Sequence, residues 1–150
     1  MNRTAVGRAP TISEELRLLE PEGSLRVLLA EQDPQMRALL ALVLHQDGHE
    51  VVEAQDASEL LEALAATLIE PARPEFDLVI CEHRLPGIPG LSVLAGLRSR
   101  ARDTAFILIT EHPDVAARAR RLGAEVLAPS FDVRALRGAI CRLDAGTNGA

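Results

Sequence analysis

The stretch FDLVICEHRLPGIPG, residues 76–90, gives the clearest indication of how this chain folds. Its apolar run, Leu78–Cys81, is short and continuous, as in a strand that is covered on both faces of a parallel sheet. Glu82 follows directly, and the loop after it holds two prolines and two glycines. A carboxylate where a buried strand opens into a loop is typical of the rim at which parallel sheets bind ligands.

Short apolar runs and helical patterns alternate along the rest of the chain. Further strands are predicted at 25–30, 49–54, 104–110 and 124–128, and helices at 34–47, 56–70, 91–101, 113–123 and 131–143. Asp33 and Pro34 suit a helix start, and Asp56 or Ser58 caps the next helix. This order predicts an α/β fold: a doubly wound, parallel five-stranded sheet with right-handed crossovers and helices on both faces.

Leucine-rich stripes at helical spacing are expected to face the sheet. They comprise Met36, Leu39, Leu40, Val43 and Leu44; Leu60, Leu61, Leu64 and Leu68; and Val133, Leu136, Ile140 and Leu143. Cys81 and Cys141 both lie among apolar residues, so we expect two buried thiols and no disulfide framework.

The composition is that of a globular domain, with 47% hydrophobic and 25% charged residues among 150. No apolar run is long enough for a membrane span, and the N-terminus has no apolar signal region, so a cytoplasmic protein without membrane contact is expected. A net charge of -6 and the lack of Trp and Tyr argue against nucleic-acid binding. Residues 1–23 are expected to be a polar extension or linker, 24–144 the domain, and 145–150 a disordered tail.

Polar residues follow three of the predicted strands. Glu31 and Gln32 come after the first strand, Glu82 after the third, and Thr110 ends the fourth. The carboxyl ends of parallel strands lie at one edge of the sheet, so these four side chains should converge on one rim.

Residues 25–143 resemble the receiver domain of response regulators in two-component signalling. The resemblance rests on VLLAEQDPQMRALL (27–40), GHEVVEAQDASELLEAL (48–64), FDLVICEHRLPGIPGLSVLAGLR (76–98), AFILIT (105–110) and ARRLGAEVLAPSFDVRAL (119–136), which occur in the family's order and spacing. It implies a CheY-like, flavodoxin-like (βα)5 fold with strand order 2-1-3-4-5.

In that family, an Asp at the end of the third strand accepts a phosphoryl group. Two acidic residues after the first strand hold Mg²⁺, and a Ser or Thr and a Lys contact the phosphoryl oxygens. By the resemblance, Glu82 stands at the acceptor, Glu31 and Gln32 at the acidic pair, Thr110 at the hydroxyl and Pro129 at the Lys. The resemblance therefore implies a degenerate pocket, or pseudo-receiver, without catalytic or metal-binding residues.

Phosphoryl transfer requires positioning and charge compensation, so these changes should impair it. Gln32 removes a charge that Mg²⁺ needs, and Pro129 supplies no cation. The extra methylene of Glu82 moves the acceptor oxygen, and a misplacement of about 1 Å can cost roughly a hundredfold in rate. We expect weak or absent Mg²⁺ binding, no enzymatic activity, and protein–protein interaction that does not depend on phosphorylation.

Three alternatives remain open for the pocket. Glu82 either mimics a phosphoryl group, with His83 or Arg84 as the receiving cation, or is an inert polar residue at the rim. Glu82 or a nearby Asp could instead be a working phosphoacceptor. A small metal-binding domain, with zinc held by His83, His112, Glu82 and Glu31, is the third reading.

The resemblance also suggests an interaction face. The family often dimerises, or contacts its output, through the surface that corresponds here to 113–123, 124–128 and 131–143. Its candidate residues are Val115, Arg118, Arg121, Val126, Arg134 and Arg137. This basic stripe suits an acidic signalling partner, the chain's own output domain or a second copy.

The loop APSF (128–131) differs from the family's Lys-Pro pair, which is commonly cis. A cis bond between Pro129 and Ser130 would cost about 3 kcal/mol, so this bond is predicted to be trans. A cis Ala128–Pro129 bond is one way in which the loop could be rebuilt.

Overall fold

The computed structural model describes residues 23–70 and 74–148. Its strands are β1 (Arg26–Ala30), β2 (Glu50–Ala54), β3 (Leu78–Glu82), β4 (Ala105–Ile109) and β5 (Glu125–Leu127). Its helices are α2 (Pro34–Gln46), α3 (Ala57–Ile69), α4 (Gly90–Ser99), α5 (Pro113–Arg121) and α6 (Val133–Asn148). All strand pairs are parallel, in the order β2-β1-β3-β4-β5, which confirms the predicted flavodoxin-like topology.

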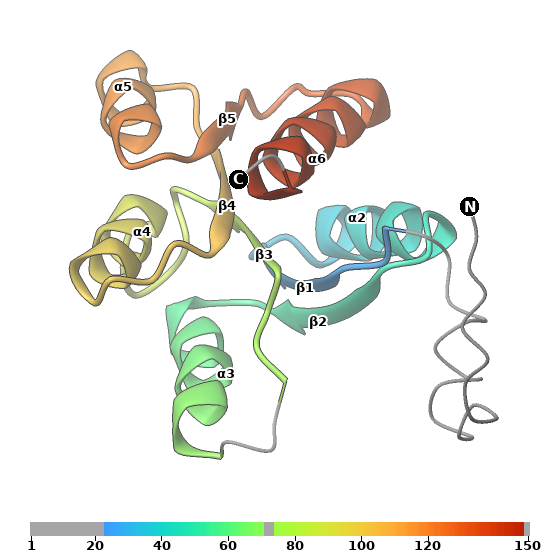
Figure 1. Cartoon of the computed structure of the whole chain (residues 1–150). Helices are drawn as coiled ribbons and strands as arrows, with labels where there is room; N and C mark the ends of the chain where they lie inside the picture. The colour runs from blue at the N-terminus through green and yellow to red at the C-terminus, as the bar shows by residue number, and fades with distance from the viewer. Residues whose placement is uncertain (1–22, 71–73, 149–150) are drawn as a thin grey trace, which may run out of the picture.

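Successive side chains of each strand point to opposite faces of the sheet, and helices cover both faces. Leu28, Val79 and Phe106 lie side by side on one face, under α3, α4 and α5. The other face packs against α2 and α6, through neighbours such as Ile80 and Ile107. Figure 1 shows the two layers of helices on either side of the sheet. This double coverage explains why the strands read as continuous apolar runs.

The two helices after β1 and β2 begin at side-chain caps. Asp33 Oδ1 accepts a hydrogen bond from the backbone N of Gln35 at 3.1 Å, as predicted for a helix that starts at Pro34. Of the two predicted caps for α3, Asp56 is the one used, because its Oδ1 accepts from Glu59 N at 2.9 Å. The cap at Asp33 fixes the direction of the loop that carries Glu31 and Gln32.

Helix α4 begins where it touches β3 most closely, at Gly90. A Cβ atom there would lie 2.6 Å from the carbonyl oxygen of Glu82, 2.9 Å from Leu108 Cδ1 and 3.0 Å from Cys81 Sγ. These distances are too short for any side chain, so only glycine lets the helix start against the strand. The contact holds the loop after Glu82 close to the sheet.

Several residues that were predicted to be buried are exposed: Leu39, Leu61, Leu68, Val133 and Cys141. Leu39, Leu61 and Cys141 each adjoin a buried residue, and neighbouring positions on a helix are about 100° apart. The sheet covers only one stripe of each helix, and these three side chains lie on the solvent side of their buried neighbours. Val133 is the first residue of α6, and Leu68 lies near the end of α3.

Two boundaries also differ from the prediction. Glu82 is the last residue of β3 and does not follow it, since it still pairs with Ile109 of β4. Helix α6 extends to Asn148, beyond the predicted helix end at 143. The predicted extension at 1–23 lies almost entirely outside the described residues.

The backbone has two further properties that bear on the predictions. The described residues contain no cis peptide bond, so the trans prediction for Pro129–Ser130 is confirmed and a cis Ala128–Pro129 bond is wrong. Within residues 23–70 and 74–148, no helix is both long enough and apolar enough to cross a bilayer.

Candidate functional site

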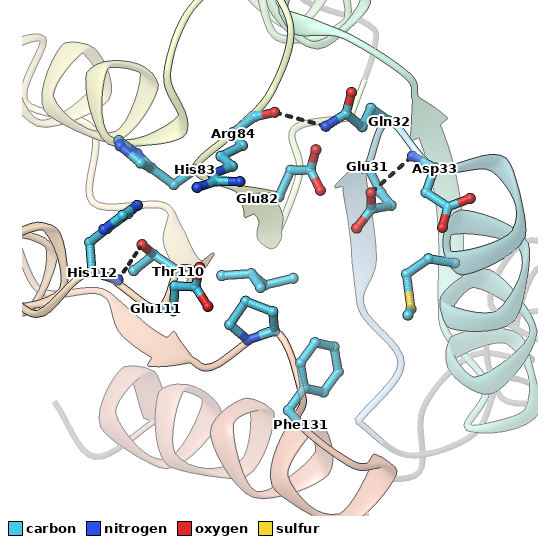
Figure 2. A pocket seen from close by; sticks show the side chains of 13 residues that line it. Glu31, Gln32, Asp33, Glu82, His83, Arg84, Thr110, Glu111, His112 and Phe131 are labelled. Atoms are coloured by element: carbon cyan, nitrogen blue, oxygen red, sulfur yellow. Dashed lines mark hydrogen bonds between the residues drawn. The ribbon is translucent and has the colours of Figure 1, made fainter.

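A cavity of about 530 Å³ opens at the carboxyl ends of β1, β3 and β4. The predicted residues Glu31, Gln32, Glu82, Thr110 and Pro129 all line it, so the structure brings the whole set together (Figure 2). Its other lining residues are Asp33, Met36, His83, Arg84, Ile109, Glu111, His112 and Phe131.

Glu31 is held firmly at the end of β1. Its side chain is buried, with 6% of its surface exposed, and its backbone N donates to Ala54 O at 3.0 Å. The carboxylate oxygen Oε2 accepts from Asp33 N at 3.0 Å, and Arg37 donates to the Glu31 backbone carbonyl at 2.8 Å. These bonds fix the carboxylate at the wall of the cavity.

Gln32 bridges the loops that follow β1 and β3. Its amide nitrogen Nε2 donates to the carbonyl oxygen of Arg84 at 3.2 Å (Figure 2). A neutral donor therefore occupies a lone pair of that carbonyl and ties the two loops together. A metal ion that took the Gln32 side chain as a ligand would have to break this hydrogen bond.

Glu82 points into the cavity from the end of β3, and one of its two carboxyl oxygens has no hydrogen-bond partner in the described part of the chain. Its oxygen Oε1 is buried and has no hydrogen-bond partner among the described residues. Burial raises the pKa of Glu82 to about 8, and the adjacent Glu31 carboxylate adds to this increase, while hydrogen bonds from Gln32 oppose it. Near neutral pH the two carboxyls therefore hold one proton between them rather than two full charges.

The hydroxyl of Thr110 is directed to the start of α5. Its Oγ1 accepts from the backbone N of His112 at 3.1 Å, and the residue is 6% exposed. This contact is local to the loop after β4 and does not reach Glu82. Thr110 thus lies at the predicted rim, and its hydroxyl oxygen accepts a hydrogen bond within the turn that leads into α5.

His83 and His112 approach each other on one side of the cavity. Their ring centroids are 6.5 Å apart at an interplanar angle of 76°. His83 Nδ1 accepts from Leu91 N at 3.3 Å, and burial, followed by the charges of His112 and Arg84, lowers the pKa of His83. No group of three or more His, Cys, Asp or Glu side chains in the described ranges is arranged to hold a metal, so the zinc alternative lacks its ligand set.

No cation of the described residues forms an ion pair with Glu82. Arg84 lines the cavity but is exposed and makes no ion pair with Glu82, and Pro129, which also lines the cavity, carries no charge. Mg²⁺ prefers an octahedron of oxygens and is usually held by one or two carboxylates together with waters. Glu31, Asp33, Glu82 and Glu111 line the cavity, and the amide nitrogen of Gln32 is turned to the carbonyl of Arg84.

Sequence reasoning missed the apolar side of the cavity. Met36, Ile109 and Phe131 line it together with Pro129. Met36 belongs to the predicted helical stripe, and Phe131 lies two residues after Pro129, but neither position indicated by itself that its side chain reaches the rim. Their placement depends on how α2 and the loop after β5 pack.

The predicted interaction face is only partly available. Arg118, Arg121 and Arg134 are exposed, and Val115 and Val126 are half-buried. Arg137 instead makes two hydrogen bonds, of 2.8 and 2.9 Å, to the carboxylate of Asp47 at the end of α2. Arg137 therefore faces α2 and is not a free cation beside β5.

Comparison with known proteins places this fold and site among signalling domains. The family model described as the response regulator receiver domain matches residues 27–140. The chain is 34% identical over 120 residues to response regulator protein FleR of Pseudomonas aeruginosa, which covers 78% of this chain and 24% of FleR. It is 38% identical over 101 residues to the positive alginate biosynthesis regulatory protein of the same organism, which covers 67% of this chain and 39% of that protein.

A solved structure agrees with this assignment. Response regulator protein TrrA of Thermotoga maritima, in complex with Mg²⁺ and BeF, matches with a TM-score of 0.67 and 28% identity. The match covers 79% of this chain and 98% of TrrA. This chain spans less than half the length of the two curated relatives named above. With the family match over most of its length, the chain belongs to the response regulator receiver domains of two-component signalling.

Proposed function

We propose that this receiver domain works in the cytoplasm as a protein–protein interaction module whose binding does not depend on phosphorylation. Receiver domains are in general non-enzymatic signalling modules that contact signalling partners or output domains. One observation supports the proposal: Glu82, Gln32 and Pro129, which the resemblance places at the acceptor, the metal site and the cation, all line one cavity. The pocket is thus changed at the acceptor, the metal site and the cation together.

Weak Mg²⁺ binding follows from the contact between Gln32 and Arg84. To ligate the ion, the side chain of Gln32 would have to give up its 3.2 Å hydrogen bond and would still bring no charge. Mg²⁺ loses its water shell reluctantly and is usually held by carboxylates. Without the ion, little charge compensation remains for phosphoryl transfer.

The contacts of Glu82 favour an inert residue over a phosphoryl mimic. A mimic needs a cation at its oxygens, yet no cation of the described residues pairs with Glu82, its Oε1 has no partner, and the raised pKa of Glu82 favours the neutral acid. Thr110 Oγ1, the expected switch hydroxyl, accepts from His112 instead. Glu82 therefore lacks the contacts that would let it hold an active conformation.

The test is a titration with fluoroberyllate and Mg²⁺, followed by amide NMR. Wild type, Glu82→Asp and the double variant Glu82→Asp/Gln32→Asp are compared, with TrrA as the positive control. We expect no saturable shift in wild type and a Mg²⁺-dependent shift in the double variant, which regains both carboxylates at the family's spacing. A saturable, Mg²⁺-dependent shift of the β1, β3 and β4 termini in wild type would overturn the proposal.

For the partner surface, we propose the exposed basic side chains of α5 and α6. Arg118 and Arg121 on α5 and Arg134 on α6 are exposed cations, and Val115 and Val126 are half-buried. Such a surface suits an acidic patch on a signalling partner or output domain, or on a second copy of this chain. Arg137 is excluded from it by its pair with Asp47.

A quantitative pull-down separates this surface from the pocket. We expect Arg118→Glu/Arg121→Glu to recover about tenfold less partner than wild type, because charge reversal opposes an acidic surface. Arg100→Glu on α4 is the matched control, and Glu82→Ala and Glu82→Asp should equal wild type. Light scattering of the same variants detects a homodimer. Recovery that depends on Glu82 and not on the arginines would contradict both parts of the proposal.

A further inference from the structure

The cavity has two chemically different sides. Glu31 and Glu82 form a carboxyl side, and Figure 2 shows Phe131 facing them from below. Met36 and Ile109 complete the apolar side around Phe131. A cavity of about 530 Å³ with one polar and one apolar side has the size and character of a small-molecule or side-chain pocket.

The carboxyl side has unused hydrogen-bonding capacity. An ionised carboxylate can accept about four hydrogen bonds. Glu31 is 94% buried, since 6% of it is exposed, and its side chain accepts one bond, from Asp33 N at 3.0 Å. Glu82 Oε1 is buried with no partner. The buried Glu31 carboxyl and the buried Oε1 atom of the half-buried Glu82, each with empty acceptor sites, favour a ligand that donates hydrogen bonds and carries positive charge.

The cations nearest the cavity do not fill this role. Arg37 donates to the backbone carbonyl of Glu31 at 2.8 Å and forms an ion pair with Glu53 at 3.3 Å. Arg84 is exposed and makes no ion pair with either carboxyl. The Nδ1 atom of His83 is occupied by Leu91 N. Among the residues that the structure describes, the carboxyl side thus lacks a cationic partner.

We propose that this cavity binds an organic cation, namely a primary ammonium or guanidinium group on an apolar stem. The head donates to Glu31 and Glu82, and the stem packs on Met36, Ile109 and Phe131. An ammonium group carries three donors and requires no octahedral oxygen cage, so Gln32, a defect for Mg²⁺, does not hinder it. The ligand chemistry is that of a Lys or Arg side chain of a partner, or of a free alkylamine.

This inference rests on the proposed function, because a tightly bound Mg²⁺ would occupy the same carboxyls. Its test is an amide NMR titration of the full chain with n-butylamine at neutral pH, where the amine is protonated. Nα-acetyl-lysine N-methylamide is the second probe and represents a partner's side chain, and n-butanol is the neutral control. A parallel titration uses MgCl₂ alone.

We expect saturable shifts at the ends of β1, β3 and β4 with both amines and none with n-butanol. Glu82→Gln should weaken n-butylamine binding about fivefold or more, because it removes a carboxyl that ionises beside the bound ammonium. Phe131→Ala should weaken binding about threefold, because it removes the apolar contact. Glu62→Gln, an exposed change on α3, should leave binding unaltered. Tighter binding of the lysine derivative than of n-butylamine identifies a partner side chain as the ligand.

Two outcomes overturn the inference. One is the lack of saturable shifts with either amine, which would mean that Glu31 and Glu82 merely share a proton. The other is equal binding of n-butanol, which would show an apolar cavity only. The MgCl₂ titration separates the failures: tight Mg²⁺ binding refutes the proposed function, whereas binding of neither Mg²⁺ nor amines refutes this inference alone.

Discussion

At the scale of a single residue, Glu82 carries the most unusual chemistry of the pocket. It ends β3 in pairing with β4, and its carboxyl lies against that of Glu31, so that neither is fully solvated. Two carboxyls so close favour one shared proton over two charges. The residue that resemblance places at the phosphoacceptor is therefore mostly a neutral acid near pH 7, which is a poor nucleophile.

The stability of the fold should depend on pH through Glu82. Its pKa is raised from 4.5 to about 8, so the folded chain binds the proton more tightly than the unfolded chain. The resulting stabilisation is complete below the unfolded pKa and is lost as pH rises through about 8. Urea unfolding at about pH 5 and about pH 9 should show wild type losing about 1–2 kcal/mol more than Glu82→Gln, after allowance for partial exposure.

The control for this prediction is Glu62→Gln, which changes an exposed carboxylate outside the cavity. It should retain the wild-type pH dependence. If Glu82→Gln lost as much stability as wild type between about pH 5 and about pH 9, the pH dependence would not come from a proton bound at Glu82, and the prediction would be wrong.

The sequence predicted which residues lie at the rim of the sheet. It did not predict the hydrogen bonds and ion pairs that their side chains make. Glu31, Gln32, Glu82 and Thr110 converge because parallel strands bring their carboxyl ends to one edge. The contact from Gln32 to the Arg84 carbonyl depends on the conformation of two loops that no local pattern specifies. The pair of Arg137 with Asp47 joins residues 90 positions apart, and the charge stripe alone gave no sign of it.

At the scale of elements, the junction of α4 with β3 positions the loop after Glu82. Gly90 begins α4, and its backbone N donates to the carbonyl of His83 at 3.0 Å. The helix start is thus bonded to the same loop that carries His83 and Arg84. Changes at this junction should alter both stability and the shape of the pocket.

Gly90→Ala should destabilise the fold by about 2–3 kcal/mol, since the added Cβ overlaps backbone and core atoms. Gly96→Ala in the same helix is the matched control. Its Cβ would meet nothing closer than Arg100 Nη1 at 3.7 Å, so helix propensity should stabilise it by about 0.5–1 kcal/mol. Urea unfolding measures both, and equal effects of the two changes would refute the role given to Gly90.

The helical spacing of apolar residues predicted every helix of the described residues. It did not predict which leucines of each apolar stripe are buried. Leu40 and Leu60 are buried, whereas their neighbours Leu39 and Leu61 are exposed. The stripe of leucines is wider than the part of the helix that contacts the sheet. In the sequence, the whole stripe looks like one apolar face. Only the packed structure shows which side of the stripe meets the strands.

At the scale of the whole molecule, the fold and the pocket chemistry are separable. The sheet core consists of apolar strand residues covered by α2 and α6 on one face and α3, α4 and α5 on the other. None of these contacts requires a phosphoacceptor, a metal ligand or a lysine. The receiver fold therefore does not depend on the chemistry of the pocket.

The most direct test of the changed pocket is calorimetric titration of wild type and Gln32→Asp with MgCl₂ near pH 7.5. Gln32→Asp restores a carboxylate after β1 and removes the donor that bonds to the Arg84 carbonyl. We expect no saturation of wild type below about 10 mM Mg²⁺, and at least about tenfold tighter binding by the variant. Submillimolar binding of Mg²⁺ by wild type, unchanged in Gln32→Asp, would contradict the account.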